Sequence, residues 1–233
     1  MENINEMANN MTKDDVRTEE LFDLSKTIAK PLLSRYKYPW EALKGIGEFI
    51  EFIGGALSND EYDLVSDNIW IHKSVAIPPS VCLAGPMIIC SNTELRHGAF
   101  FRGNVIIGEG AVAGNSCEIK NSIIFDNAQI PHYNYIGDSI IGFKGHMGAG
   151  SITSNLKSDK SLVKVHLGDE DIETGIKKFG AMVGDFVEVG CGSVLNPGTV
   201  IGKRSVIYPL SSIRGCVPAN SIYKGKDNIV KKR

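Results

Sequence analysis

The fold is decided by residues 95–119, LRHGAFFRGNVIIGEGAVAGNSCEI, in which every sixth residue is apolar. The spacing extends further back and covers Ile71, Ile77, Leu83, Ile89, Leu95, Phe101, Ile107, Ala113 and Ile119. An α-helix does not keep an apolar stripe at a period of six, and simple strand alternation has a period of two. A hexapeptide repeat predicts a parallel β-helix, in which short strands wind around one apolar core.

The repeat slips by one residue twice, is interrupted, and then resumes. It continues at Ile124, Ile130, Ile136, Ile141 and Met147, and it returns at Val183, Val189, Leu195, Ile201, Ile207 and Ile213. A second small or apolar residue often follows four positions later, as at Ala99, Val105, Ala111 and Cys117. Each hexad therefore points one large and one small group inward, and neighbouring coils must stack to bury them.

Composition narrows the functional classes. The chain has 233 residues and a formal charge of -2, which is not the basic footprint of a nucleic-acid-binding protein. It holds no apolar run of about 20 residues that could span a bilayer. No secretory signal is visible at the N-terminus, and the five cysteines form no disulfide-dense pattern. We expect a cytoplasmic protein with no membrane and no nucleic-acid partner.

The segments outside the repeat have a different character. Residues 1–17 are polar and are expected to form a disordered tail. Residues 18–66 are expected to form a helical cap over the open end of the coil, which would otherwise expose unpaired strand edges. Thr18 is expected to cap a first helix that Pro31 kinks or ends. A second helix should begin at Pro39 and end at Gly54-Gly55.

The β-helix is expected to occupy residues 67–222. Its repeat disappears over 155–182, which predicts a loop leaving the coil, with a short hairpin as one form of it. Residues 223–233 are rich in lysine and arginine. We expect a basic tail there, either solvated or in contact with the phosphates of a cofactor.

Arg102 and Lys120 are the clearest chemical clue in the coil. Each follows an inward position, so both should point outward, and they are three hexads apart. If three hexads make one coil, they stack at roughly the strand spacing of 4.8 Å, where two cations repel each other. One interpretation is an anion such as phosphate bound between them. The other is that each pairs with a nearby acid such as Glu118.

His132 also falls on an outward position, and Tyr135 is expected on the same face. A neutral imidazole can accept a proton from an attacking amine or hydroxyl near pH 7. A metal site is the other use of histidine on a β-helix. The histidines here lack the paired spacing that such sites use, and we predict no metal.

A longer motif makes a family resemblance specific. The stretch Pro131–Asp138, PHYNYIGD, followed by Met147–Asn155, MGAGSITSN, resembles the acetyltransferase half of the bacterial bifunctional enzyme that makes UDP-N-acetylglucosamine. The resemblance covers about residues 68–220. It implies an all-β, left-handed parallel β-helix that acts as a homotrimer and acetylates an amino-sugar phosphate from acetyl-CoA.

The resemblance also implies roles for individual residues. His132 matches the general base, Arg102 and Lys120 match the cations that hold the sugar phosphate, and Tyr135 matches a sugar-binding tyrosine. His146 stands where the family usually has a sugar-binding asparagine. The acetyl-CoA contacts correspond to Ala149, Asn155 and Leu156, and more weakly to Cys191 and Tyr208.

The sequence therefore predicts an acetyl-CoA-dependent N-acetyltransferase for glucosamine 1-phosphate, galactosamine 1-phosphate or a nucleotide-linked amino sugar. The residue at 146 and the segment after Asn155 depart from the family pattern, which leaves the sugar open. No uridyltransferase half is expected within this sequence. Two alternatives stay open: a non-catalytic β-helix that binds a nucleotide sugar or a partner, and a hexapeptide O-acetyltransferase acting on a hydroxyl.

Overall fold

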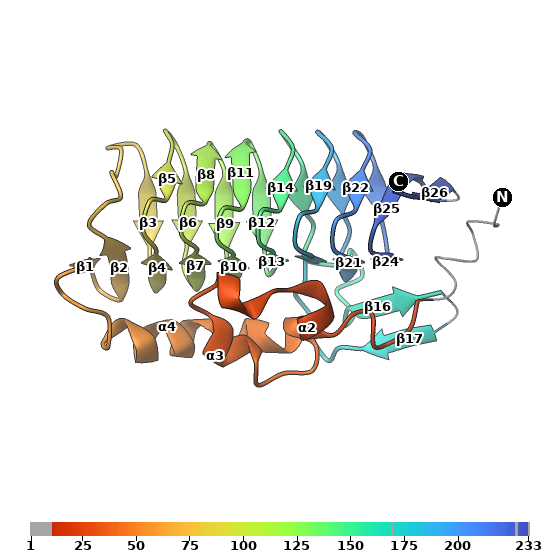
Figure 1. Cartoon of the computed structure of the whole chain (residues 1–233), viewed down its shortest axis with the longest axis horizontal. Coiled ribbons are helices and arrows are strands. Elements are labelled where there is room, and N and C mark those ends of the chain that lie inside the picture. The colour runs from red at the N-terminus through yellow and green to blue at the C-terminus, as the bar shows by residue number, and fades with distance from the viewer. Residues whose placement is uncertain (1–10, 169, 227, 233) are drawn as a thin grey trace.

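The computed structural model describes residues 11–168, 170–226 and 228–232. Three sheets run side by side along a coil, and the chain passes from one sheet to the next at each corner (Figure 1). The pairing along the coil is parallel, which confirms the predicted left-handed parallel β-helix. The nine-stranded sheet has the order β1 (Tyr62–Ser66), β2 (Ile69–His72), β4 (Met87–Ile89), β7 (Val105–Ile107), β10 (Ser122–Ile124), β13 (Ile140–Ile141), β18 (Ala181–Val183), β21 (Thr199–Ile201) and β24 (Cys216–Val217).

The other two sheets carry the predicted site residues. The eight-stranded sheet consists of β5 (Glu94–Leu95), β8 (Val112–Asn115), β11 (Gln129–His132), β14 (His146–Met147), β19 (Glu188–Val189), β22 (Val206–Ile207), β25 (Ser221–Gly225) and β26 (Asn228–Lys231). The seven-stranded sheet consists of β3 (Cys82–Ala84), β6 (Phe100–Arg102), β9 (Glu118–Lys120), β12 (Tyr135–Gly137), β15 (Ile152–Thr153), β20 (Val194–Leu195) and β23 (Ser212–Ile213).

The strand register explains the slips in the repeat. Phe101 pairs with Ile119, so that coil takes 18 residues. Ile119 pairs with Ile136 and Ile136 with Thr153, so the next two coils take 17. Thr153 pairs with Leu195, and this longer coil contains the interruption of the repeat. Inward residues stay in line because each slip shortens a corner and leaves the strand pairing intact.

The predicted inward residues form one core along the coil. The first coil departs from this pattern: Ile77 is 41% exposed, and Val81 and Leu83 are only partly buried. These residues lie at the end of the coil, where stacked neighbours lie on one side. In the later coils the small inward position is often polar. Ser193 and Ser205 are buried there, and their hydroxyls donate to the backbone oxygens of Tyr208 and Pro218.

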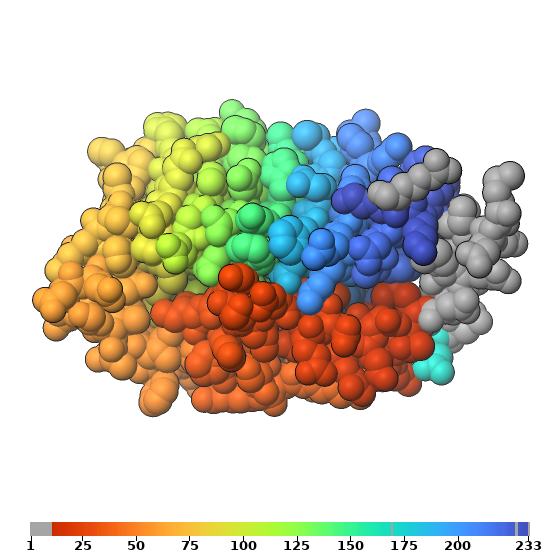
Figure 2. Space-filling view, viewed as in Figure 1, coloured from red at the N-terminus to blue at the C-terminus, as the bar shows by residue number. Residues whose placement is uncertain are grey.

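The nine-stranded sheet is apolar on its outer face as well. One register column of buried or partly buried side chains runs through Trp70, Ile88, Ile106, Ile123, Ile140, Met182, Val200 and Cys216. These side chains join a second apolar cluster with the N-terminal segment. Figures 1 and 2 show that segment lying along the side of the coil.

The N-terminal segment therefore covers a face of the coil, and the prediction of a cap over its open end was wrong. Its elements are α2 (Thr18–Leu21), η1 (Leu24–Lys26), α3 (Lys30–Leu33), η2 (Pro39–Gly45) and α4 (Ile46–Gly54). The physical reason is that a sheet face made of isoleucine and valine needs apolar cover. Trp40, Leu33 and Ile50 supply part of it, all of them essentially fully buried.

Some of the predicted helix boundaries in this segment are confirmed and others were wrong. The predicted start at Pro39 and end at Gly54 are confirmed. Thr18 is not a cap: Arg17 holds that position, and the Thr18 hydroxyl donates to the Tyr36 carbonyl oxygen at 3.0 Å. Pro31 lies in the first turn of α3, so it begins a helix where we expected one to end.

The two chain ends, predicted as a disordered tail over 1–17 and a basic tail over 223–233, differ from the structure where they are described. Residues 1–10 lie outside the described residues, but Val16 is buried in the second cluster. At the other end, β25 and β26 pair as an antiparallel hairpin, and Ile229 joins the inner core. The C-terminal residues that are described therefore close the coil with strands and do not form a solvated tail.

The interruption of the repeat is a hairpin beside the coil. Strands β16 (Lys164–Leu167) and β17 (Glu170–Glu173) pair antiparallel, and Val163, Val165 and Leu167 are buried against the second cluster. Strand β16 lies next to β21 and β24. Across the described residues, no helix is both long and apolar enough to cross a membrane.

Candidate active site

Three predicted site residues lie at one corner of the coil on successive turns. The Gly150 N–H donates to the His132 carbonyl oxygen at 3.0 Å, and the Gly192 N–H donates to the Ala149 carbonyl oxygen at 2.9 Å. The Leu210 N–H continues the ladder to the Cys191 carbonyl oxygen. His132, Ala149 and Cys191 therefore occupy equivalent positions, and this corner separates the eight-stranded sheet from the seven-stranded sheet.

The His132 side chain is open at this corner. It is exposed, and its imidazole has no hydrogen-bond or ion-pair partner within the described part of the chain. On the next turn, the Ala149 N–H donates no backbone hydrogen bond to any described residue. A free imidazole and a free amide N–H on adjacent turns can serve as a proton acceptor and as a donor to a developing oxyanion.

Asn134 holds the backbone beside His132, and sequence reasoning assigned it no role. Its side-chain oxygen accepts from the His132 N–H at 3.1 Å, and its amide donates to the carbonyl oxygens of Gly148 and Ser151 at 2.8 and 3.0 Å. It is buried, and Tyr133 before it has a φ of 54°. An asparagine beside an exposed aromatic residue in the quoted motif was the available signal.

Arg102 and Lys120 each have a carboxylate partner. Arg102 pairs with Glu118 at 2.6 Å, and Lys120 pairs with Asp138 at 3.1 Å. Of the two interpretations open at the sequence, the paired acids account for how two stacked cations are tolerated here. Asp138, which sequence reasoning also left without a role, is buried and accepts a further hydrogen bond from the Asn121 amide at 2.8 Å.

Tyr135 and Asn155 lie next to this ion pair. The Asn155 amide donates to the Tyr135 hydroxyl at 3.2 Å and also to the Asp138 carboxylate. Burial raises the pKa of Tyr135 above its usual value, so its hydroxyl keeps its proton at neutral pH. Gly137 allows the approach, because a Cβ there would lie 2.5 Å from the tyrosine oxygen. Tyr135, Asn155, Lys120 and Asp138 form one polar cluster.

His132 and Tyr135 do not share a face, so that expectation was wrong. Strand β11 with His132 belongs to the eight-stranded sheet, and β12 with Tyr135 belongs to the seven-stranded sheet. The chain turns between them at Tyr133 and Asn134. The reason is that a corner falls there, and hexad phase alone does not show which residues lie on either side of it.

The remaining predicted residues lie further apart. His146 is in the eight-stranded sheet, where its Nδ1 lies 2.8 Å from the Glu188 carboxylate. Tyr208 is exposed near the C-terminal end, with the Lys224 amine 5.6 Å from its ring centre. Leu156 is exposed and lines a cavity beneath the β16–β17 hairpin. The described residues contain no group of three or more His, Cys, Asp or Glu that could hold a metal ion.

The chain is similar in sequence to several known proteins. A family model, the GMPPB C-terminal domain, matches residues 83–170. The chain is 35% identical over 195 residues to the bifunctional protein GlmU of Methanococcus maripaludis, a match that covers 83% of this chain and 47% of the relative. It is 31% identical over 177 residues to the bifunctional sugar-1-phosphate nucleotidylyltransferase/acetyltransferase of Sulfurisphaera tokodaii, covering 68% and 44%.

One similar solved structure is PerB from Caulobacter crescentus in complex with CoA and GDP-perosamine. The match covers 76% of this chain and 62% of PerB at 18% identity, with a TM-score of 0.31. The chain spans about half the length of the curated relatives it matches. The fold defines a class, the parallel β-helix built from hexapeptide repeats, and the curated relatives that this chain matches are bifunctional sugar-1-phosphate enzymes. Within that class, the chain resembles the acetyltransferase part of the bifunctional sugar-1-phosphate enzymes.

Proposed function

We propose that the protein is an acetyl-CoA-dependent N-acetyltransferase acting on an amino-sugar phosphate. One observation carries this proposal: the exposed His132 imidazole lies one turn from the Ala149 N–H, and neither group has a hydrogen-bond partner among the residues that the structure describes. The names of the relatives support it. The residues at this corner fit a thioester donor, because they offer a base for the attacking group and an N–H donor for the carbonyl oxygen.

The proposed chemistry balances as a simple acyl transfer. The amine nitrogen of the sugar attacks the thioester carbonyl, and a C–N bond forms as the C–S bond breaks. His132 takes the proton from the attacking nitrogen and returns it to the departing CoA sulfur. The Ala149 N–H donates to the carbonyl oxygen while negative charge develops on it.

Residues of the seven-stranded sheet position the substrate in this proposal. Arg102 and Lys120 hold the sugar phosphate. Glu118 turns toward solvent when the phosphate binds, while Asp138 stays buried and keeps its hydrogen bonds from the Asn121 and Asn155 amides. Tyr135 contacts the sugar from the same cluster, and the Asn155 amide, assigned to acetyl-CoA binding, donates to the tyrosine hydroxyl. Holding the phosphate places the amine beside the base, which is a large part of the rate gain in a two-substrate reaction.

The proposed assembly is a homotrimer. Within one chain, His132 and His146 lie on one side of the corner, and the cluster around Tyr135 lies on the next sheet. A groove between two copies brings one set against the other, so that one copy supplies the base and its neighbour the phosphate site. Acetyl-CoA then lies along the corner ladder past Ala149 and Cys191.

The test is CoA thiol release from acetyl-CoA with glucosamine 1-phosphate and galactosamine 1-phosphate. Replacing the base, His132→Ala, should lower kcat by about 10²- to 10⁴-fold. His97→Ala is the matched control, because His97 is an exposed histidine at the same corner two turns earlier. Full activity in a His132→Ala protein that keeps its oligomeric state would show that the base is another residue.

One observation favours an O-acetyltransferase as the second candidate. Glu118 and Asp138 already neutralise the two cations, so an acceptor without phosphate would leave these ion pairs intact. The two candidates differ in their dependence on phosphate. Equal kcat/KM values for an amino-sugar phosphate and the unphosphorylated sugar would favour hydroxyl or neutral acceptors, whereas a large preference for the phosphate favours the first proposal.

A further inference from the structure

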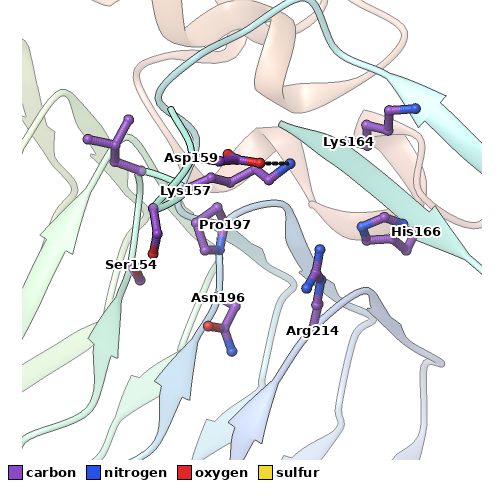
Figure 3. A pocket seen from close by; sticks show the side chains of 10 residues that line it. Ser154, Lys157, Asp159, Lys164, His166, Asn196, Pro197 and Arg214 are labelled. Carbon is purple, nitrogen blue, oxygen red and sulfur yellow. Dashed lines mark ion pairs between the residues drawn. The ribbon is translucent and has the colours of Figure 1, made fainter. Parts of the chain in front are cut away.

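A polar cavity of about 380 Å³ lies between the β16–β17 hairpin and the strand ends of the seven-stranded sheet (Figure 3). It is lined by Ser154, Leu156, Lys157, Ser158, Asp159, Lys164, His166, Asn196, Pro197 and Arg214. On the coil side, Ser154, Asn196 and Arg214 follow the register pairs of β15, β20 and β23, so they stack on successive turns. The hairpin contributes Lys164 and His166 from the opposite wall.

The cations that line this cavity differ in how they are paired. Lys157 has Asp159 as a partner and Lys164 has Asp171 and Glu173, whereas Arg214 has no carboxylate partner among the described residues. Lys157 reaches Asp159 only at 3.8 Å, while Lys164 pairs with Glu173 of β17 at 2.6 Å. Figure 3 shows Arg214 between Asn196 and His166, and it forms no ion pair with any residue in the described ranges. An unpaired guanidinium that faces a cavity beside two further cations attracts an anionic ligand.

The polar groups in the walls suit a phosphoryl group. A guanidinium presents N–H donors in a fork that matches two phosphate oxygens. The His166 Nδ1 lies 2.6 Å from Asp171, which leaves Nε2 for a ligand. The Ser154 hydroxyl lies on the same wall as Arg214 (Figure 3). Asn196 is not a donor here, because its amide donates to Ser212 and to the Ile213 carbonyl oxygen.

The cavity is separate from the site around Lys120. Register pairs place Lys120 beside Gly137, and the same column continues through Ser154 and Asn196 to Arg214. Four strand spacings amount to about 19 Å, so one phosphoryl group cannot contact both Lys120 and Arg214. The anion that this cavity fits is therefore not the sugar phosphate assigned to Arg102 and Lys120.

We propose that the cavity is a second phosphate-binding site, which holds a phosphoryl group of an organic phosphate through Arg214, with Lys157 and His166 in support. Phosphate esters of this kind occur in the 3′-phosphate and diphosphate of CoA and in the diphosphate of a nucleotide sugar. The shared chemistry is a negatively charged phosphoryl group carried by a larger molecule. A cavity of this volume admits the phosphate end of such a ligand and leaves the rest outside.

Isothermal titration calorimetry of the 233-residue chain tests this site without turnover. The probes are CoA, dephospho-CoA, a uridine diphosphate sugar and inorganic phosphate. Arg214→Gln should weaken at least one of them about tenfold, as expected when a charge-assisted hydrogen bond is lost. Arg35→Gln, which removes an exposed cation on the N-terminal segment, is the matched control and should change no affinity more than about twofold.

The arms of the experiment identify the ligand. Weakening for CoA but not dephospho-CoA assigns the 3′-phosphate. Weakening for both assigns the CoA diphosphate, and weakening for the uridine diphosphate sugar assigns the nucleotide. An effect on inorganic phosphate alone supports the site with free phosphate as its ligand. Unchanged affinity for all four probes in Arg214→Gln, with an unchanged unfolding midpoint, overturns the proposal.

Two further variants keep this inference separate from the proposed function. Arg102→Gln should impair acetyl transfer to a phosphorylated sugar and leave binding in the cavity unchanged. Arg214→Lys keeps the charge but loses the fork, so its affinity should fall between those of the wild type and Arg214→Gln. A protein with no acetyl transfer that still loses phosphate binding in Arg214→Gln would retain this site and reject only the enzymatic proposal.

Discussion

Replacing Asn134 should loosen the corner that carries His132. The buried amide makes hydrogen bonds to the His132 N–H, the Gly148 and Ser151 carbonyl oxygens and the Ser151 hydroxyl. In Asn134→Ala, the Gly148 oxygen keeps its bonds from the Ser151 N–H and hydroxyl. The His132 N–H loses the partner that Asn134 supplied, and so does the Ser151 oxygen. At about 1–3 kcal/mol for each unsatisfied buried group, we expect a loss of about 2–4 kcal/mol in the free energy of unfolding.

Asn134→Asp is the informative companion, because it keeps the shape and one acceptor. Its second carboxylate oxygen would face the Gly148 and Ser151 carbonyl oxygens, which accept from the amide in the wild type. The variant should be at least as unstable as Asn134→Ala at neutral pH and should recover in acid, where the protonated carboxyl can donate again. Urea unfolding at fixed protein concentration measures both. A loss below about 0.5 kcal/mol in both variants would refute the reasoning.

Two other predictions concern the N-terminal segment. Trp40→Ala should destabilise the protein by about 3–5 kcal/mol because this ring is 1% exposed against the coil, whereas Phe52→Ala, at a ring 76% exposed, should cost less than about 0.5 kcal/mol; equal losses in thermal unfolding would contradict the covered-face packing. Asp185 accepts hydrogen bonds from the Asp23 and Phe143 N–H groups, and burial raises its pKa above the usual value. The folded state therefore binds this proton more tightly, so the contribution of Asp185 is fully present below its unfolded pKa and is lost as pH rises through its folded pKa. Unfolding free energies measured across this range should differ less between wild type and Asp185→Ala at higher pH, and a gap that widens with pH would contradict the direction of the shift.

The sequence was sufficient for the repeat because the same physical requirement recurs on every coil. Ile107, Ile119 and Ile201 must each point into one narrow interior, and the strand pairing then places them in register. The two slips were also visible, since a shorter corner shifts the apolar position by one residue. A local pattern repeated many times is read with little ambiguity.

The N-terminal segment was placed wrongly because its partner surface is not marked by the period. Ile88, Ile106 and Ile140 lie one position before the inward residues, and strands buried on both faces read as continuous apolar runs. The signal was present in MII, VII and SII, but its meaning depends on which of the three sheets those strands form. Only the assembled coil shows that they share one face.

For the candidate site, too, some features follow from the sequence and others only from the tertiary structure. The sequence determined the inward core and an outward histidine at position 132, and it left two possible states for Arg102 and Lys120. The tertiary structure decided that carboxylates pair with these cations, that a corner separates His132 from Tyr135, and that Arg214 faces a cavity beneath the hairpin. The reason is that the period of six is set by contacts within the coil, whereas ion pairs and cavities form between residues that the chain brings together from as far apart as Lys157 and Arg214.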